Sequence, residues 1–213
     1  MNHLRNETKI SHNTPEIIEK SYDCQAGTAI EKINNEPIFK EYKNGLVSVL
    51  SGIIFDKPRT KTVTELGCGD GIMIKDLALK HPDLQFIGID LSEERIKAAE
   101  EYCKNIDNIG FIKGNESNIC SDITYTVHCL EPNGGSEEYL LKSIINNTSE
   151  YVILIEPSYE LGNDKTKNNI LTHKYIMNLE KAVKNTKMKF THGFLGIGKD
   201  TNQNALTVIK VEK

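Results

Sequence analysis

Two carboxylates separated by a run of glycines are the residues of this chain whose spacing most clearly points to chemistry. Glu65 closes a β-rich run and opens the segment Glu65-Leu66-Gly67-Cys68-Gly69-Asp70-Gly71. Glycines let backbone N–H groups approach a ligand that a Cβ would keep away. Asp90 stands 19 residues after Gly71, at the end of the next β-rich run. A carboxylate there accepts two hydrogen bonds from a ribose diol, so the pattern predicts a nucleoside-binding site; the alternative is a tight turn with ordinary polar strand ends.

The glycine spacing also bears on which nucleoside is bound. A dinucleotide site favours Gly-x-Gly-x-x-Gly, which turns a helix N-terminus toward a pyrophosphate. This chain has Gly-x-Gly-x-Gly, with Asp70 between the last two glycines. We expect the carboxylate of Asp70 to repel a diphosphate, which favours a cationic or zwitterionic nucleoside.

An alternation of strands and helices must position these residues. The β-rich runs are residues 62–66, 85–90, 109–113, 123–129 and 151–156, and the helical stretches are residues 71–80, 92–105, 135–146 and 167–184. Strands separated by single helices predict a mostly parallel sheet with right-handed crossovers. Two further runs, residues 188–197 and 205–211, predict a terminal antiparallel hairpin. The expected fold is therefore a Rossmann-like α/β sheet of seven strands with helices on both faces.

The first 60 residues have a different pattern. Asn13-Thr14-Pro15 and Asn35-Glu36-Pro37 each place a polar residue before a Pro, as at the start of a helix. Apolar residues then recur at three- and four-residue steps from Ile38 to Ile53, which predicts a helix lying on a core. We divide the chain into a helical cap or lid, residues 1–60, and a nucleoside-binding domain, residues 61–213.

The glycine segment, Asp90 and the segment Gly114-Asn115-Glu116 together resemble class I S-adenosylmethionine-dependent methyltransferases. The resemblance covers the chain from about residue 60 and includes the final hairpin. It implies that the glycine loop holds the methionine part of S-adenosylmethionine, that Asp90 holds the ribose and that Leu91 packs on the adenine. Asn115 stands where the family usually has Asp, and its amide oxygen still accepts a hydrogen bond. The cofactor-binding residues implied are Glu65, Gly67, Cys68, Gly69, Asp90, Leu91, Asn115, Glu116 and His128.

The methyl acceptor should bind where the fourth and fifth strands end, because ligands of open α/β sheets lie outside the carboxyl ends of the strands. A hydroxyl acceptor benefits from a base, and His128, with an ordinary pKa of about 6.5, is the expected one; its alternative role is a hydrogen bond to cofactor or backbone. Glu131 and Glu156 could bind a cationic acceptor or orient His128, and each could equally cap a following helix. His173 could reach the site if residues 157–175 fold over it; its alternative is a solvent-facing position on a helix. The expected substrate-pocket residues are Tyr22, Glu156 and Tyr159.

Composition narrows the function further. No apolar run is long enough to span a bilayer, and the N-terminus lacks the features of a secretory or transit signal, so we expect a cytoplasmic protein. The net charge of −4 disfavours nucleic acid as a partner. Five scattered cysteines and dispersed carboxylates and histidines predict neither disulfides nor a metal site.

The sequence therefore predicts a methyltransferase that modifies an oxygen, or a nitrogen, of a small polar metabolite in a bacterial biosynthetic pathway. One alternative is a protein or RNA methyltransferase, which a lysine cluster between residues 181 and 189 leaves open. Others are a nicotinamide-dependent reductase, an enzyme that uses the nucleoside sulfonium differently and a nucleoside-binding regulatory module without catalysis. The oligomeric state stays open between monomer and homodimer.

Overall fold

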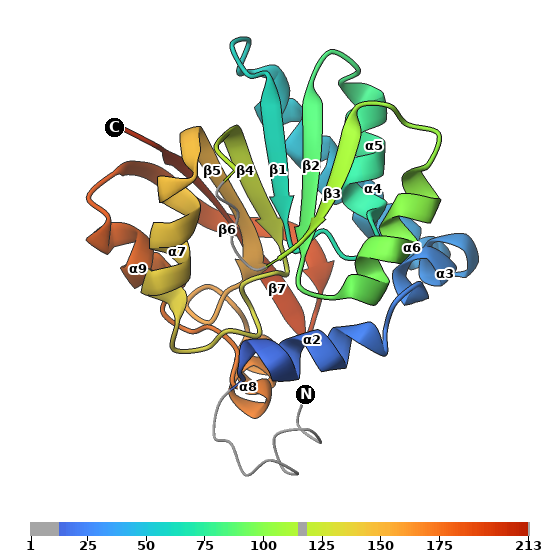
Figure 1. Cartoon of the computed structure of the whole chain (residues 1–213). Helices are drawn as coiled ribbons and strands as arrows, with labels where there is room; N and C mark the ends of the chain where they lie inside the picture. The colour runs from blue at the N-terminus through green and yellow to red at the C-terminus, as the bar shows by residue number, and fades with distance from the viewer. Residues whose placement is uncertain (1–12, 115–118, 213) are drawn as a thin grey trace.

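The structure of the chain, a computed structural model, describes residues 13–114 and 119–212. Within these residues the chain forms a seven-stranded sheet in the order β3-β2-β1-β4-β5-β7-β6 (Figure 1). The strands are β1 Thr62–Leu66, β2 Gln85–Asp90, β3 Ile109–Lys113, β4 Ser121–Val127, β5 Thr148–Pro157, β6 Lys189–Lys199 and β7 Asn202–Lys210. The first five pair in parallel, and β7 runs antiparallel to both β5 and β6. The predicted Rossmann-like sheet with a terminal hairpin is confirmed.

The helices are α2 Pro15–Asp23, α3 Thr28–Asn35, α4 Pro37–Phe55, α5 Ile72–Lys80, α6 Glu93–Cys103, α7 Glu137–Asn146, α8 Asp164–His173 and α9 Leu179–Asn185. The prediction of one helix over residues 167–184 was wrong, because α8 and α9 are separate. Lys174 adopts the left-handed conformation (φ 55°), and its N–H bonds back to the carbonyls of Ile170 and Leu171. This local turn ends α8 before the chain begins α9.

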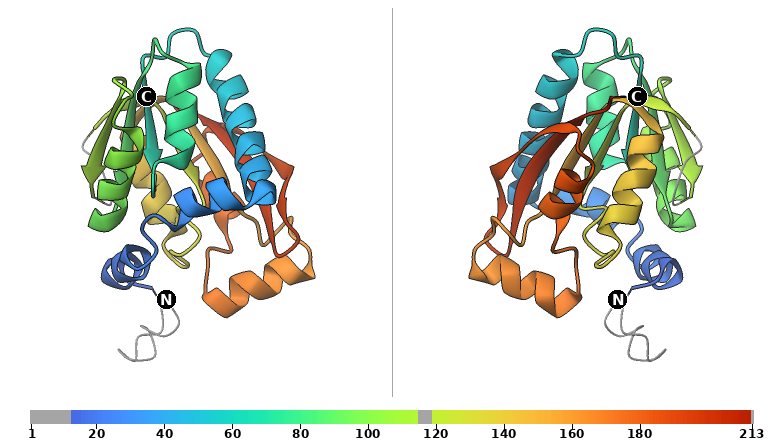
Figure 2. Two further views of the ribbon diagram at one scale, coloured as in Figure 1. Left: turned by 90° about the vertical axis from the view of Figure 1, so that its right-hand side faces the viewer. Right: turned by 90° about the vertical axis from the view of Figure 1, so that its left-hand side faces the viewer.

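The two faces of the sheet carry separate apolar cores. In β5, Ile153 and Ile155 pack with α4 and α5, whereas Val152 and Leu154 pack with α7 and α9. The alternation follows from the two-residue period of a strand. Helices consequently cover both faces of the sheet (Figure 2).

The N-terminal segment has two structural parts. Helix α4 belongs to the core of the α/β domain, since Leu46, Val47, Leu50 and Ile54 are buried against α5 and the sheet. Helix α2 instead lies across the carboxyl ends of the central strands (Figure 1). Helix α4 therefore packs as part of the α/β core, although it precedes the boundary expected at residue 60; the lid role of the N-terminal segment stays a prediction.

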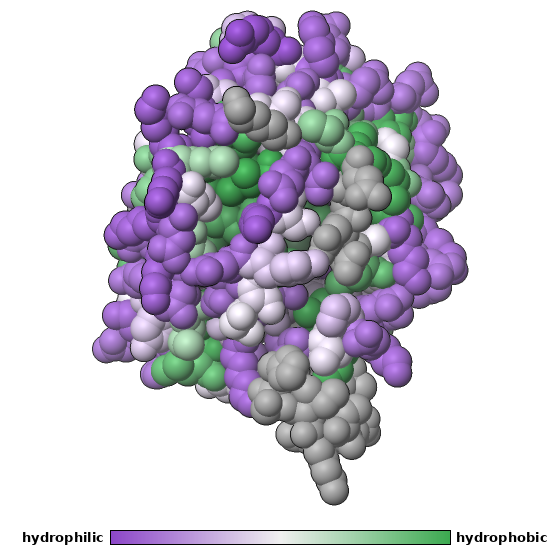
Figure 3. All heavy atoms as spheres, turned by 60° about the vertical axis from the view of Figure 1, so that its left-hand side comes forward, coloured by the Kyte–Doolittle hydropathy of each residue, from purple (hydrophilic) through white to green (hydrophobic). Residues whose placement is uncertain are grey.

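Most side chains on the face shown in Figure 3 are hydrophilic, with apolar side chains visible in patches between them. None of the helices in residues 13–114 and 119–212 is long and apolar enough to cross a membrane. The same part of the chain contains no group of three or more His, Cys, Asp or Glu side chains arranged to hold a metal ion.

Candidate functional site

The turn between β1 and α5 depends on its glycines. Gly67, Gly69 and Gly71 all have positive φ angles of 75°, 52° and 77°. A Cβ on Gly67 would lie 2.5 Å from Sγ of Cys129, and one on Gly69 would lie 3.0 Å from the guanidinium of Arg95. Side chains at these positions would therefore strain the backbone and clash with the side chains packed against the loop. The loop leaves a cradle of backbone next to the end of β1.

Asp90 fastens this loop to the end of β2. One carboxylate oxygen accepts a hydrogen bond from the N–H of Gly69 at 2.8 Å, and the other accepts one from the N–H of Ser92 at 2.9 Å. Burial raises the pKa of Asp90, and these two hydrogen bonds and the charge of Arg95 oppose the rise. Each oxygen keeps a second lone pair, so the ribose contact of Asp90 stays a prediction that this geometry allows.

Glu65 lies beneath the glycine loop with only 2% of its surface exposed. Its carboxyl accepts a hydrogen bond from the hydroxyl of Tyr125 at 3.0 Å. Burial raises the pKa of Glu65 to about 8, against the opposing effect of that hydrogen bond. Glu65 is therefore mostly protonated at neutral pH, and a cationic ligand group beside it would favour the carboxylate.

Asp70 is not the free negative charge that the sequence suggested. It is 1% exposed; one oxygen lies 3.6 Å from Nε of Arg95, and the other accepts a hydrogen bond from the N–H of Ala29 at 3.0 Å. The guanidinium of Arg95 in turn lies over the ring of Tyr22, 4.9 Å from its centroid. Because Arg95 compensates Asp70, repulsion by Asp70 no longer argues against a diphosphate. The case against a dinucleotide rests on glycine spacing alone.

A cavity of about 620 Å³ opens from the glycine loop. Helix α2 and the residues around it cover it: the side chain of Asn13 donates to the carbonyl of Pro132 at 2.5 Å, and Ser92 donates to Asp23 at 2.6 Å. The predicted site residues that line this cavity are Tyr22, Glu65, Gly67, Cys68, Gly69, Asp90, Leu91, His128 and Glu131. Asn115 and Glu116, predicted as cofactor contacts, lie outside the described residues.

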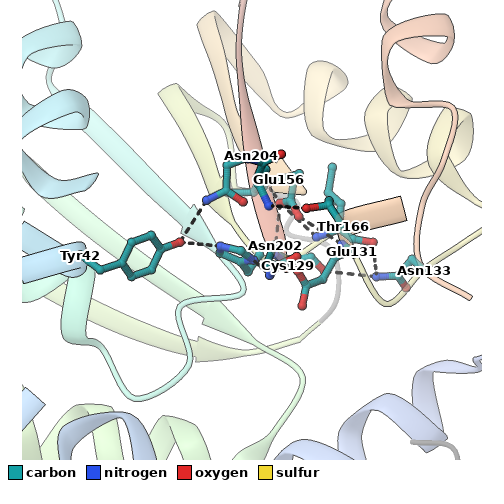
Figure 4. A network of polar contacts seen from close by, with 12 residues as sticks. Tyr42, Cys129, Glu131, Asn133, Glu156, Thr166, Asn202 and Asn204 are labelled. Carbon is teal, nitrogen blue, oxygen red and sulfur yellow. Dashed lines mark hydrogen bonds and ion pairs between the residues drawn. The ribbon is translucent and has the colours of Figure 1, made fainter. Parts of the chain in front are cut away.

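Elsewhere in the cavity lining, His128 connects two side chains. Its Nδ1 lies 2.7 Å from a carboxylate oxygen of Glu131, and its Nε2 lies 2.7 Å from the hydroxyl oxygen of Tyr42. Tyr42 reaches this point from α4, and Asn204 of β7 donates to the same hydroxyl at 3.1 Å (Figure 4). His128 itself has a positive φ of 56°, a rarely populated conformation for a residue with a Cβ.

The charge state of His128 follows from these contacts. Burial by itself lowers the pKa of His128, but the charge and hydrogen bond of Glu131 outweigh burial, and the net effect raises the pKa to about 10. This raised pKa favours the imidazolium form at neutral pH, and both ring nitrogens are engaged by Glu131 and Tyr42. The predicted role of His128 as a general base is not supported by this arrangement, because a base must start unprotonated.

Glu156, expected in the substrate pocket, is instead a structural residue. It has no exposed surface and is absent from the cavity lining. Its carboxylate accepts hydrogen bonds from the hydroxyl of Thr126 at 2.7 Å and from the backbone N–H groups of Cys129, Leu130 and Glu131 at 3.1 Å each. Glu156 thus shapes the turn after β4, which carries His128 and Glu131.

Two other predicted residues do not reach the cavity. Tyr159 is half-buried but does not line it. His173 ends α8 and stacks on Tyr175, with ring centroids 5.3 Å apart. Tyr175, which the sequence did not single out, lines the cavity in its place. The left-handed turn at Lys174 explains the difference. It ends α8 at His173, so Tyr175 takes a direction that a continuous helix would not give it.

The sequence also gave no reason to select Tyr42, Asn202 or Asn204. Tyr42 belongs to an apolar helical stripe, and its spacing predicts a core residue. Asn202 and Asn204 were assigned to the hairpin turn, whereas both lie in β7, on the same side of the strand. The spacing of Asn202 and Asn204 at i and i+2, next to an apolar run, is the sequence feature that could have indicated two polar side chains on one side of a strand.

Comparison with known proteins agrees with this geometry. Residues 63–130 match the sequence profile of a family described as a methyltransferase domain. A tRNA (guanine-N(7)-)-methyltransferase of Brevibacillus brevis is 40% identical over 58 residues, which is 26% of this chain and 27% of that protein. The chain thus matches about a quarter of the length of this curated relative.

Two longer matches cover most of the chain. A carboxy-S-adenosyl-L-methionine synthase of Nautilia profundicola is 24% identical over 175 residues, 76% of this chain and 71% of that protein. The crystal structure of magnesium protoporphyrin IX methyltransferase from Synechocystis PCC 6803, with bound S-adenosylhomocysteine, superposes with a TM-score of 0.74 at 10% identity. That superposition covers 93% of this chain and all of the other, and it shows a shared fold.

Proposed function

We propose that this chain, which contains an S-adenosylmethionine-dependent methyltransferase domain, transfers a methyl group to an oxygen of a small polar metabolite. The observation that carries the proposal is one continuous cavity that joins the glycine loop to the cluster of Tyr42, His128 and Glu131. Cofactor and acceptor would meet within it. Holding two reactants in contact in a closed site is itself a large part of catalysis.

The residues at the glycine loop fit this cofactor. Gly67 and Gly69 let the loop take positive φ angles and lie against Cys129 and Arg95, and Glu65 offers a buried carboxyl to a cationic group. Asp90 would hold the ribose, and Leu91 would lie against the adenine. When bound, S-adenosylmethionine supplies an electrophilic methyl group on its sulfonium. The chain contributes binding, orientation and, through α2, exclusion of water.

Several observations favour a small acceptor over a macromolecule. A cavity of about 620 Å³ is within the usual range for a single drug-sized ligand, and here it must hold cofactor and acceptor together. The lysine cluster that left RNA open is partly neutralised, because Lys184 pairs with Glu180 at 2.7 Å and Lys189 with Glu212 at 3.1 Å. The similarity to the tRNA methyltransferase covers only 26% of this chain.

The match to the Nautilia profundicola synthase supports a second candidate, an enzyme that modifies the nucleoside sulfonium itself. It covers three quarters of the chain, although the identity is low. The two candidates differ in their products, since only a methyltransferase leaves S-adenosylhomocysteine.

The proposal is tested with S-adenosylmethionine that carries a tritiated methyl group. The purified chain is incubated with a deproteinised small-molecule extract of the source cells, with total RNA and with a protein fraction, in separate reactions. We expect label in the small-molecule fraction and equimolar S-adenosylhomocysteine. Label confined to RNA or protein, or a heavier nucleoside without transfer, would replace the proposal with the corresponding alternative.

A further inference from the structure

We propose that the first turn of α6 holds helix α2 over the cofactor cavity, and that these contacts control how fast the cofactor leaves. The positioning residues are Ser92 and Arg95 on α6 and Tyr22 and Asp23 on α2, and we call these four residues the latch. The inference rests on the proposed function and adds a control of cofactor exchange to the same site.

Arg95 occupies a helix position that local chemistry favours for another residue type. Ser92 is the N-cap of α6, and its hydroxyl accepts a hydrogen bond from the N–H of Arg95 at 3.2 Å. Three residues after a serine N-cap, Glu or Gln is favoured, because its side chain returns to the N–H of the N-cap. A cation in the first turn is also opposed by the helix dipole. Arg95 thus does not help α6 to begin, and its role lies in contacts outside this helix.

The contacts of Arg95 join two other parts of the site. Its Nε lies 3.6 Å from a carboxylate oxygen of Asp70 in the glycine loop, and its guanidinium lies over the ring of Tyr22 in α2, 4.9 Å from the centroid. The Arg95 side chain is 16% exposed and that of Asp70 is fully buried, so solvent screens this ion pair little. The ring of Tyr22 adds a cation–π contact to the same guanidinium. One cation therefore attaches both the glycine loop and α2 to α6.

Ser92 makes a second connection between α6 and α2. Its hydroxyl donates to the carboxylate of Asp23 at 2.6 Å, while its N–H donates to Asp90 at 2.9 Å. Asp23 is the last residue of α2, where the helix dipole opposes a negative charge, so this carboxylate, like Arg95, has a position that its own helix does not favour. Moving α2 away would break the hydrogen bond of Asp23 and the contact of Tyr22 together.

The glycine loop also caps the helix that follows α2. Helix α3 begins after Gly27, which has no side chain to cap it. The N–H of Ala29, in the first turn of α3, instead donates to the carboxylate of Asp70 at 3.0 Å. An N-cap carboxylate of the helix itself would make the same contact. The N-terminal segment is therefore attached on both sides of the turn between α2 and α3, at residues next to the expected cofactor contacts Gly69 and Asp90.

The position of α2 connects the latch with cofactor exchange. Tyr22, Asp70 and Arg95 line the cavity, and α2 lies across the carboxyl ends of the central strands (Figure 1). A bound cofactor would lie between the glycine loop and this helix, so it leaves when α2 moves away. Loss of one latch contact should make that movement easier and raise the rate of dissociation. The exposed ion pair of Lys113 with Glu19, 2.9 Å long, is screened by water and should contribute little.

The test measures how fast S-adenosylhomocysteine dissociates from the full chain. Tritiated S-adenosylhomocysteine is bound and chased with an excess of the unlabelled compound, and the label that the protein retains is followed over time. Asp23→Ala removes the partner of Ser92 without changing a residue that lines the cavity. Tyr22→Leu removes the ring that contacts Arg95, whereas Tyr22→Phe keeps the ring and is its matched control. Lys20→Ala, at an exposed position of α2, is the control for Asp23→Ala.

Amide hydrogen exchange of the same proteins, measured by mass spectrometry, reports where the structure opens. We expect Asp23→Ala and Tyr22→Leu each to dissociate about tenfold faster than the wild type, because each loses one partly buried contact to a charged group. Exchange should become faster in residues 15–29 and stay unchanged in α5. Tyr22→Phe and Lys20→Ala should match the wild type in both measurements.

Three results would overturn the latch. The first is an unchanged dissociation rate in both Asp23→Ala and Tyr22→Leu. The second is faster dissociation without faster exchange in residues 15–29, which would place the effect inside the cavity. The third is faster exchange in α5 as well, which would show that the substitutions loosen the whole domain. If the wild-type chain does not bind S-adenosylhomocysteine, the proposed function itself is contradicted, whereas binding with unchanged rates in the variants overturns this inference alone.

Discussion

The hydroxyl oxygen of Tyr42 lies 2.7 Å from Nε2 of His128, although 86 residues separate them in the chain. Tyr42 comes from α4, which packs beside α5 on one face of the sheet, and His128 follows the end of β4. The contact joins α4 to the turn after β4, and both residues line the cavity.

Methyl transfer should be nearly independent of pH between about 7 and 9 and should fall as the pH approaches and passes 10. The reason is that the charge and hydrogen bond of Glu131 raise the pKa of His128 to about 10, so the charge of this ring should not change between pH 7 and 9. The rate of label transfer at saturating cofactor, measured across this range, checks it. A rate that climbs steadily from pH 6 to pH 9 would instead indicate a base that must lose its proton.

Cofactor binding should release a proton at pH 7. Burial raises the pKa of Glu65 to about 8, so the carboxyl is mostly protonated in the free protein, and a cationic group of the ligand would lower that pKa and expel the proton. Calorimetry with S-adenosylhomocysteine in buffers of different ionisation enthalpy measures the number released. We expect a value approaching one for the wild type and near zero for Glu65→Gln; equal values in both proteins would show that Glu65 does not face the ligand's charge.

Replacing Glu156 should destabilise the fold more than it alters substrate selection. The carboxylate accepts hydrogen bonds from the backbone N–H groups of Cys129, Leu130 and Glu131, and a glutamine places an NH₂ group where an acceptor is needed. We expect Glu156→Gln to lower the free energy of unfolding by about 2–4 kcal/mol. Urea denaturation measures the loss. Glu138→Gln, on the exposed part of α7, is the control and should change stability by less than about 0.5 kcal/mol; a comparable effect of both variants would contradict the structural role of Glu156.

The residues that could be predicted from the sequence are those fixed by local pattern. Glu65, the glycines after it and Asp90 lie together because parallel strands end at the same edge of a sheet, and the alternation of strands and helices was enough to place them there. The terminal hairpin followed from two strand-like runs without a helix between them.

The acceptor end of the site depends on long-range packing that no local pattern encodes. Tyr42 has the spacing of a core residue, and only the docking of α4 next to β7 brings its hydroxyl to His128 and Asn204. Glu156 ends a strand as a binding residue would, yet the turn after β4 folds over its carboxylate. His173 is directed away by a single left-handed residue, Lys174, and no glycine or asparagine stands at that position to indicate the turn.

Calorimetric titration of the full chain with S-adenosylhomocysteine tests the central claim most directly. We predict binding at one site, with NADH binding much more weakly, and an affinity reduced by about 1.5–3 kcal/mol in Asp90→Ala but unchanged in the surface control Asp107→Ala. The two carboxylates differ in that Asp90 lines the cavity and Asp107 does not. Absence of binding, a preference for NADH, or an Asp90→Ala variant that binds as tightly as the wild type would contradict the assignment of this cavity to S-adenosylmethionine and its demethylated product.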